Sequence, residues 1–423
     1  MGCVPPVAVG FFPLDEELEL LPGQLTPRGQ EQLVRLGAWM PFAQAAELFE
    51  DFTRVTVTEA WVRRHTEQAG AAAVAHQTAA VEQLERETPA PPVGPDKLCL
   101  SADGAFVPLV HKEWGEVKTL MVGEVAPPVI ENGEPVVHLQ AVSYFSRLTD
   151  HQTFARLALV ETQRRGVESA HQVAAVTDGA EWLQGFIQFH RADAVRILDF
   201  PHAASYVNTI GQGIYGEGTP ESLIWLQAQL HALKHEGPSA VLSDLHALTR
   251  TRPDKPELEA AWEYLDKREA HLHYPRFQAE GWPIGSGAVE SGNKLVVEAR
   301  LKGSGMHWAR PHVDPLLALR NLVCNQRWAE GWAQIVHWQR HWLHAQQVTR
   351  RLKRQAARLT AASVIEAPLA APPPPPVSPP VRSEGPASSI PGSHRPAANH
   401  PWRHMCVGRA QYLPAKPKKD AKL

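Results

Sequence analysis

The feature that most constrains the fold is a proline-rich break, TPAPPVGPD, at residues 88–96. Four prolines in nine residues cannot continue a helix or a central strand. Before this break the apolar residues recur at helical spacing, whereas after it short β-rich runs alternate with polar turns. The chain therefore divides into an all-helical part and a part that contains a β-sheet.

Seven runs after the break predict the order of elements in the second part. They are three β-rich runs (97–110, 117–130 and 136–148), a helix (150–166), a strand (171–178), a helix (179–190) and a strand (194–200). This is the order of elements in an RNase H-like domain, an α/β fold with a mixed sheet and helices on its faces. The next residues, 203–280, are helical throughout and predict an all-helical insertion.

Residues 25–88 predict three helices, the first with Thr26 as its N-cap and the third beginning near residues 56–58. Two short helices, a polar break and a third helix that carries Arg63 and Arg64 are typical of a helix-turn-helix DNA-binding domain. A three-helix module for packing or oligomerisation has the same pattern. Both interpretations therefore stay open at the level of sequence.

The carboxyl-terminal part of the chain is first basic and then proline-rich. Residues 331–365 have no Asp or Glu but carry Arg350, Arg351 and Arg354 after a group of tryptophans, so this stretch could follow DNA phosphates. A helix that packs its tryptophans and exposes its arginines explains the stretch equally well. Residues 367–423 contain 14 of the 37 prolines and few aliphatic residues, which predicts a disordered tail.

We therefore expect eight segments along the chain. They are a short amino-terminal segment (1–24), a helix-turn-helix-like domain (25–88), a linker (89–96), the first part of the sheet domain (97–202), the helical insertion (203–280), the second part of the sheet domain (281–330), a basic helical extension (331–366) and the disordered tail (367–423).

The composition excludes several classes of protein. A hydrophobic share of 43% and a charged share of 21% are ordinary for a soluble globular chain. No apolar run approaches the ~18 residues of a membrane-spanning helix, and the amino terminus lacks the pattern of a secretion signal. The four cysteines are too far apart to indicate a disulfide framework, which fits a reducing cytoplasm. With a net charge of −3, any contact with nucleic acid depends on local basic patches.

Two aspartates stand where a buried charge is costly. Asp103 lies inside the first predicted strand, in SADGAF, and Asp178 ends the fourth, in VTDGAEW. If those strands are neighbours, the two carboxylates lie side by side and repel each other, and a divalent cation such as Mg²⁺ relieves that repulsion. Asp-Gly is also a common turn dipeptide, so each aspartate alone could be a turn residue. Two of them at the ends of apolar strands in this topology favour a metal site.

Glu290 is the third acidic residue, and it falls in the first turns of the helix that follows GWPIGSGAV. The flanking Gly285 and Gly287 let a backbone approach closely, and Ser286 is a predicted cap. Glu298, two turns along on roughly the same face, is its rival as a metal ligand, and an ordinary amphipathic surface helix is the alternative to both. The helix also presents polar and cationic side chains that suit DNA, namely Asn293, Lys294, Arg300 and Lys302.

The run GSGAVESGNKLVVEARLKGSGMHW, together with SADGAF, VTDGAEW and ILDFPHAASY, closely resembles the insertion-sequence transposases of the ISKra family, which are relatives of the Mutator-like DDE transposases. The resemblance implies an RNase H-like catalytic core with an all-helical insertion between the second aspartate and the glutamate. It also implies that Asp103, Asp178 and Glu290 are the catalytic triad. Asp199 and His202, in DFPH, match a short Asp/Cys-x-x-His element of that family and are expected to support the triad.

The similarity extends over about residues 8–345 and leaves two parts of the chain unexplained. Members of that family tend to begin with paired cysteines in a zinc-binding segment, whereas here only Cys3 is present. A zinc site needs about four ligands, so no structural zinc is expected, and residues 1–24 are expected to be the remnant of a longer segment. The proline-rich tail is not a feature that the resemblance implies.

The resemblance implies a transposase that cleaves and transfers DNA strands by two-metal phosphoryl transfer. Asp103 and Asp178 would hold one Mg²⁺ or Mn²⁺ ion, and Asp103 and Glu290 would hold the other. The expected partners are double-stranded DNA, at the insertion-sequence ends and at the target, and further copies of the chain in a homo-oligomer, with no membrane partner. The expected location is the nucleoid in a bacterial cytoplasm. The alternatives are an inactive DNA-binding protein derived from a transposase and an RNase H-like nuclease without strand transfer.

Overall fold

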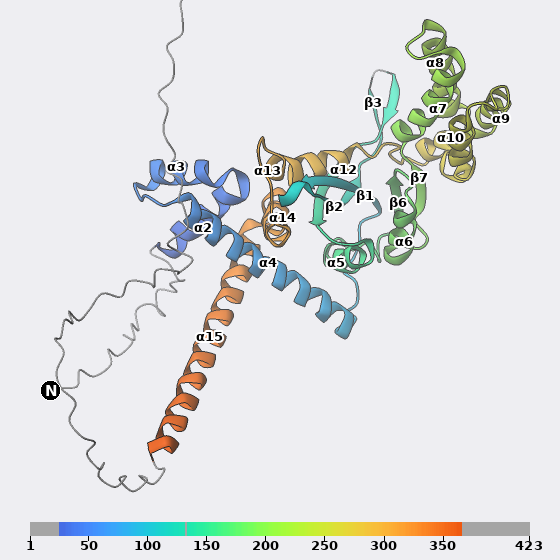
Figure 1. The fold of residues 1–423 in the computed structure, drawn as a ribbon. Helices are drawn as coiled ribbons and strands as arrows, with labels where there is room; N and C mark the ends of the chain where they lie inside the picture. Colours follow the sequence, from blue (N-terminus) through green and yellow to red (C-terminus); the bar gives the residue numbers. More distant parts are fainter. Residues whose placement is uncertain (1–24, 132, 366–423) are drawn as a thin grey trace, which may run out of the picture. The chain divides into compact units, whose positions relative to one another are not determined.

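The computed structural model describes residues 25–131 and 133–365, with side chains described as far as residue 357 (Figure 1). Of these residues, those up to Ala356 form one compact unit, and residues 357–365 fall outside it. The predicted amino-terminal remnant and the predicted disordered tail lie outside the described residues.

Three helices open the described chain. They are α2 (Pro27–Trp39), α3 (Phe42–Thr53) and α4 (Glu59–Glu87). Thr26 is the N-cap of α2, and its hydroxyl accepts a hydrogen bond from the backbone N–H of Gly29. Thr58 caps α4 in the same way, by accepting from the N–H of Trp61. The predicted starts of these two helices are therefore confirmed.

The main sheet has five strands in the spatial order β5-β2-β1-β6-β7. Their bounds are β1 Lys97–Pro108, β2 Trp114–Val125, β5 Leu139–Arg147, β6 Gln172–Thr177 and β7 Val195–Leu198. β1, β2 and β5 form an antiparallel meander, whereas β6 runs parallel to β1 and β7 runs parallel to β6. The predicted α/β class with a mixed sheet is therefore confirmed.

A small hairpin that the sequence analysis did not predict interrupts the meander. β3 (Val129–Glu131) and β4 (Glu134–Val136) form a separate two-stranded sheet, although the sequence predicts one unbroken run over 117–130. The chain leaves β2 just before two consecutive prolines, which cannot donate to a sheet ladder. Gly133, with a φ of 84°, then provides the turn of the hairpin.

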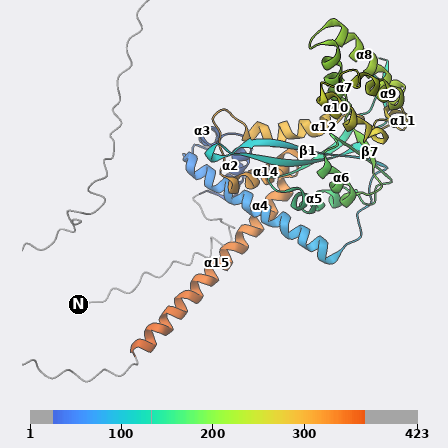
Figure 2. The ribbon, with the colours of Figure 1, turned by 45° about the vertical axis from the view of Figure 1, so that its right-hand side comes forward.

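β1 is buried on both faces, because its side chains alternate between two cores. Even-numbered residues such as Leu98 and Leu100 pack against α5 (His151–Arg164) and α6 (Glu181–His190). Odd-numbered residues such as Val107 pack against a π-helical turn, η3, and against α14. The elements on that second face are α12 (Gly287–Gly292), η3 (Asn293–Glu298), α13 (Ala299–Leu301) and α14 (Arg310–Cys324). Figure 2 shows α12 and α5 on opposite sides of β1.

The residues after β7 are helical, as predicted for 203–280. The helices are α7 (Phe200–Tyr215), α8 (Pro220–His235), α9 (Pro238–Thr249), α10 (Pro256–Asp266) and α11 (Tyr274–Ala279). Val207 of α7, Leu265 of α10 and Tyr274 of α11 lie in one core with Val176 of β6 and Ile197 of β7. The helical group therefore packs directly on the parallel edge of the sheet.

Helices α2, α3 and α4 also share a core with the sheet. Leu33, Phe49 and Val62 lie in the same apolar cluster as Val107 of β1 and Leu316 of α14. The packing role that the sequence left open for these helices is therefore present in the structure. Their side chains that face away from this core are available for other contacts.

α15 (Trp328–Ile365) is one continuous helix over most of the predicted basic extension. Trp328 and Trp332 are buried in a cluster with residues of α2 and α4. Arg350, Arg351 and Arg354 are exposed. The helix thus packs its first tryptophans and exposes its arginines. Neither this helix nor any other described helix is long and apolar enough to cross a membrane.

A substitution at Gly70 tests how closely α4 packs on α14. A Cβ built on Gly70 lies 2.2 Å from the carbonyl oxygen of Pro315, a backbone atom that cannot turn aside. We therefore expect Gly70→Ala to lower the free energy of unfolding by about 2 kcal/mol, seen as a lower Tm in circular dichroism.

Gly185→Ala is the matched control, because Gly185 lies in helix α6, is exposed and has no atom within 4 Å of an added Cβ. Its Tm should stay the same or rise slightly, since alanine favours a helix. Equal Tm values for the two variants would contradict the close packing of α4 on α14.

Candidate active site on the sheet

Asp103 and Asp178 come from two adjacent parallel strands. The register between β1 and β6 ends at the pair Leu100–Ala175. Asp103 and Asp178 each stand three residues further along the chain from that pair, the first within β1 and the second directly after β6. Both side chains are half-buried. The fold therefore brings the two predicted aspartates to equivalent places on neighbouring strands.

The Asp103 carboxylate has both repulsive and attractive neighbours. Its pKa is raised above the ordinary value, first by burial, while the backbone N–H of Gly104 lowers it and the carboxylate of Asp178 raises it further. The carboxylate of Glu290 also raises this pKa. Asp103 accepts hydrogen bonds from the Gly104 N–H at 2.7 Å and from the side-chain amide of Asn293 at 2.9 Å. The three predicted acidic residues thus share one electrostatic environment.

Glu290 reaches this environment on α12, which contacts β1 and β2. Gly292 permits this close approach, because a Cβ built there would lie 2.5 Å from the ring of Tyr144 on β5. Asn293, the next residue, is buried and donates to Asp103. Glu290 stands one helical turn before Asn293, so the two side chains project from the same side of the helix.

Glu298, the rival third ligand, is engaged elsewhere. Its carboxylate forms an ion pair with Lys302 at 2.6 Å, one helical turn further on. Glu290, in contrast, is among the charges that raise the pKa of Asp103. Glu298 is therefore already paired with a cation, whereas Glu290 forms no such ion pair among the described residues.

Asp199 holds the start of α12 in place. It is buried, and its Oδ1 accepts a hydrogen bond from the backbone N–H of Ser286 at 2.6 Å. Its Oδ2 accepts from the N–H of His202 at 2.9 Å and so caps α7. The prediction that Ser286 caps the Glu290 helix is wrong, since its side chain makes no capping bond and its backbone is bound by Asp199 instead. Asp199 is therefore a positioning residue that joins α7 to α12.

His202 packs among aromatic rings. Its imidazole lies edge-on to Tyr206 and Tyr264, with ring centroids 5.3 Å and 5.9 Å away. Tyr206 and Tyr264 stack on each other at 4.1 Å. One of the two rings that His202 contacts therefore belongs to Tyr264, whose hydroxyl binds the backbone carbonyl of Asp178.

Two side chains near the end of α10 hold the turn after β6. Tyr264 donates a hydrogen bond from its hydroxyl to the backbone carbonyl of Asp178. Arg268 binds the carbonyl of Gly179 through Nε at 3.2 Å and Nη2 at 2.9 Å, and its guanidinium lies 3.7 Å from the centre of the Tyr264 ring. Burial raises the pKa of Tyr264 to about 12, so this hydroxyl keeps its proton at neutral pH. The helical region therefore sets the position of Asp178.

In both aspartates one carboxylate oxygen accepts a hydrogen bond from a backbone N–H within two residues, as expected for a turn residue. Asp178 accepts from the N–H of Ala180 at 2.9 Å, and Asp103 accepts from the N–H of Gly104. A carboxylate oxygen has two lone pairs, so these bonds leave room for a metal ligand bond. The turn and the metal interpretations are therefore compatible at each residue.

Of the cationic residues predicted to contact DNA from the Glu290 helix, Lys294 and Lys302 are exposed, but Arg300 is buried. Arg300 donates from Nε to the carbonyl of Gly37 at 3.0 Å and lies over the ring of Phe42. Burial lowers its pKa to about 10. The prediction that Arg300 contacts DNA is therefore wrong. The π-helical turn η3 rotates the residues after it away from their places in a regular α-helix, and Arg300 faces α2 and α3 as a result.

The other arginines that were expected to contact DNA are exposed. Arg63 and Arg64 lie near the start of α4, and the remaining three lie on α15. The structure therefore leaves two separate helices on which cationic side chains can meet a DNA surface.

The side chains at the site suit a hard divalent cation. Asp103, Asp178 and Glu290 offer carboxylate oxygens, and the side-chain oxygen of Asn293 is buried without a hydrogen-bond partner in the described chain. A cation would also offset the repulsion that raises the pKa of Asp103. Across the described residues, no three His, Cys, Asp or Glu side chains gather as tightly as the ligands of one bound ion.

Tyr264 and Arg268 could not be found from the sequence. They are separated from the residues they hold by 86 and 89 positions, and a tyrosine and an arginine near the end of an amphipathic helix carry no sign of a site. Asn293 was visible in the sequence, but only as a polar residue that could contact DNA. Its hydrogen bond to Asp103 follows from the way α12 crosses the sheet.

The chain has no match in sequence that would assign its function. Comparison with models of known protein families and with curated proteins finds no match. What the protein does must therefore follow from its own residues and from their arrangement on the sheet.

Proposed function

We propose that this protein is a DNA transposase whose RNase H-like core cleaves and joins DNA strands with Mg²⁺ or Mn²⁺. The observation that carries the proposal is that the charges of Asp178 and Glu290 both act on the half-buried carboxylate of Asp103, although the three residues come from segments far apart in the sequence. The strand order, with β6 beside β1 and parallel to it, agrees with an RNase H-like core. The resemblance of the aspartate and glutamate motifs to the ISKra family supports the same function.

In this proposal Asp103 belongs to two metal-binding pairs, one with Asp178 and one with Glu290. The bound ions supply Lewis-acid activation of the attacking water, or of a DNA 3′-hydroxyl, and of the leaving oxygen. Asn293 keeps the Asp103 carboxylate oriented, and Tyr264 keeps the Asp178 backbone in place. The Asp103 carboxylate and the Asp178 backbone are therefore already held before DNA binds, which lowers the entropy cost of the reaction.

The proposal also divides the contacts with DNA into two kinds. The helices α2, α3 and the first turns of α4 act as a helix-turn-helix in which Arg63 and Arg64 reach the bases at the insertion-sequence ends. Phosphate contacts come from Lys294, Lys302, Arg350, Arg351 and Arg354. We expect the enzyme to act on double-stranded DNA as a homo-oligomer at the bacterial nucleoid.

Two other functions are possible outcomes of the tests. An inactive DNA-binding protein derived from a transposase would bind the ends without cleaving them, and a nuclease would cleave without joining. The presence of all three acidic residues favours an enzyme. A strand-transfer assay with labelled end DNA and a supercoiled target separates a transposase from a nuclease.

The triad variants test the catalytic assignment. Asp103→Asn, Asp178→Asn and Glu290→Gln should each lower the rate of Mg²⁺-dependent cleavage by about a thousandfold or more, because each removes a metal ligand worth several kcal/mol in the transition state. Glu298→Gln, on the same stretch of helix, is the control and should stay active. An active Glu290→Gln beside an inactive Glu298→Gln would show that the third ligand is assigned wrongly.

Asp103→Asn should also change the stability of the metal-free protein. Because the pKa of Asp103 is raised on folding, its ionisation destabilises the folded state as the pH rises through that pKa. The penalty is absent below the ordinary pKa of an aspartate, about 3.9, where the folded and the unfolded chain both carry the proton. We therefore expect the variant to have a higher Tm than the wild type near neutral pH and the same Tm in acid.

Added Mg²⁺ should raise the Tm of the wild type with increasing concentration and leave that of Asp103→Asn unchanged, since an ion that binds only the folded state stabilises it. A variant with a lower Tm than the wild type near neutral pH would contradict the repulsion among these carboxylates.

The two groups of arginines should differ in their effect on DNA binding. Replacing Arg63 and Arg64 by alanine should weaken binding to the insertion-sequence ends by about tenfold or more, with a much smaller effect on scrambled DNA. Replacing Arg350, Arg351 and Arg354 by alanine should weaken binding to end DNA and to scrambled DNA equally. It should also flatten the dependence of the affinity on salt. Competition binding at fixed salt measures the affinities for the two DNAs, and the same measurement at several salt concentrations gives the salt dependence. If the Arg63 and Arg64 variant loses the same affinity for end DNA and for scrambled DNA, α2–α4 have a packing role alone.

A further inference from the structure

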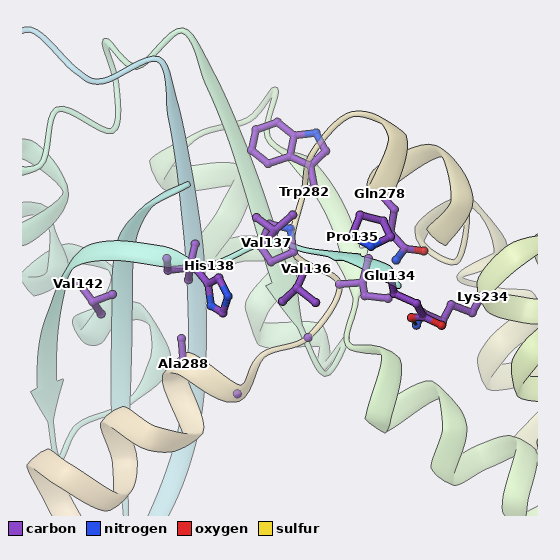
Figure 3. Close-up of a pocket in the computed structure, with 15 residues that line it drawn as sticks. Glu134, Pro135, Val136, Val137, His138, Val142, Lys234, Gln278, Trp282 and Ala288 are labelled. Atoms are coloured by element: carbon purple, nitrogen blue, oxygen red, sulfur yellow. Dashed lines mark hydrogen bonds and ion pairs between the residues drawn. The ribbon is translucent and has the colours of Figure 1, made fainter. Parts of the chain in front are cut away.

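A cavity of about 450 Å³ lies beside the stretch of chain that leads to Glu290. Its walls come from the β3–β4 hairpin, from α8 and α11, and from residues 282–288, which we call the glycine loop. Figure 3 shows Glu134 and Lys234 together at one end of the cavity and Ala288 with Val142 at the other. The cavity therefore opens along the same segment that positions the third acidic residue.

The walls of the cavity are mainly apolar, and the polar groups are few. The apolar walls include Pro135, Val136, Val137, Trp282, Ile284 and Ala288. Glu134 forms an ion pair with Lys234, and the amide of Gln278 faces the same space. A volume of this size is typical of sites for small organic groups, and a planar nucleobase has the apolar faces and polar edges that such walls suit.

Neither backbone conformation nor close packing within the chain requires a glycine at positions 285 and 287. Neither has a positive φ. A Cβ built on Gly287 meets no atom within 4 Å, and one built on Gly285 meets only Oδ1 of Asp199, at 3.9 Å. Gly292, by contrast, is required by the ring of Tyr144. The open space over these two exposed glycines lets a group from outside the chain touch the backbone.

Building on the function proposed above, we propose that this cavity receives one unpaired nucleotide of the bound DNA strand. The base enters the apolar cavity, and its sugar and phosphate lie against Gly285 and Gly287. Glu290 is only three positions after Gly287, so a strand held at the glycine loop continues directly to the catalytic carboxylates. The carboxylate of Glu134 does not oppose the strand, because Lys234 is paired with it.

Gly287→Ala tests this proposal with little risk to the fold, because the added methyl meets no atom of the chain. The probes are an end duplex with one unpaired nucleotide beside the cleavage position and the same duplex fully paired, with Kd measured by fluorescence anisotropy without Mg²⁺. We expect the variant to bind the unpaired probe about tenfold more weakly than the wild type and the paired probe within about twofold. Gly185→Ala, the matched control on α6, should change neither Kd.

A second variant fills the cavity from the hairpin side, away from the glycine loop. Val137→Trp should abolish the change in fluorescence that a 2-aminopurine at the unpaired position shows when it binds the wild type. Equal losses on both probes for Gly287→Ala, or no loss at all, would overturn the nucleotide site. So would an unchanged 2-aminopurine signal in Val137→Trp.

A failure of the nucleotide site can be distinguished from a failure of the proposed catalytic function. If Asp103→Asn cleaves as fast as the wild type, the catalytic assignment fails, whatever the two probes show. If the triad variants are inactive but Gly287→Ala binds both probes like the wild type, only the nucleotide site fails.

Discussion

The rest of the structure depends on the burial of β1 on both of its faces. Its even-numbered residues lie in one core with α5 and α6, and its odd-numbered residues lie in another with η3 and α14. Asp103 breaks this apolar pattern, and its carboxylate loses water and gains neighbours of the same charge, so its pKa rises. A fold that keeps a carboxylate in such a place loses stability unless a cation binds there.

Long-range hydrogen bonds hold this unfavourable group of carboxylates together. Asn293 binds Asp103 directly, Tyr264 binds the backbone of Asp178, and Asp199 binds the backbone of Ser286 shortly before the third acid. Two of these three contacts are made to the backbone, so they do not occupy the carboxylates that we propose as metal ligands. The helical region between β7 and α12 therefore supports the proposed site as well as covering the edge of the sheet.

The sequence-based predictions failed where a local irregularity redirected the chain. Arg300 is buried because the π-helical turn before it changes the direction in which later side chains point. The β3–β4 hairpin appears where prolines end β2, although the apolar run continues through them. Ser286 stands at a capping position, but its backbone is bound by a buried carboxylate from another segment. In each case a feature outside the short-range pattern decided where the residue lies.

The sequence by itself determined the order of the helices and of the main-sheet strands, the caps at Thr26 and Thr58, and the placement of Asp103 within one apolar strand and of Asp178 at the end of another. These features depend on periodicity, proline and capping, which act over a few residues and are visible in any short window. Only the tertiary structure decided that Tyr264 and Arg268 hold the second aspartate and that a cavity lies along the glycine loop. Those features require residues that are tens to hundreds of positions apart to meet, and the packing of the whole sheet and its helices decides which of them do.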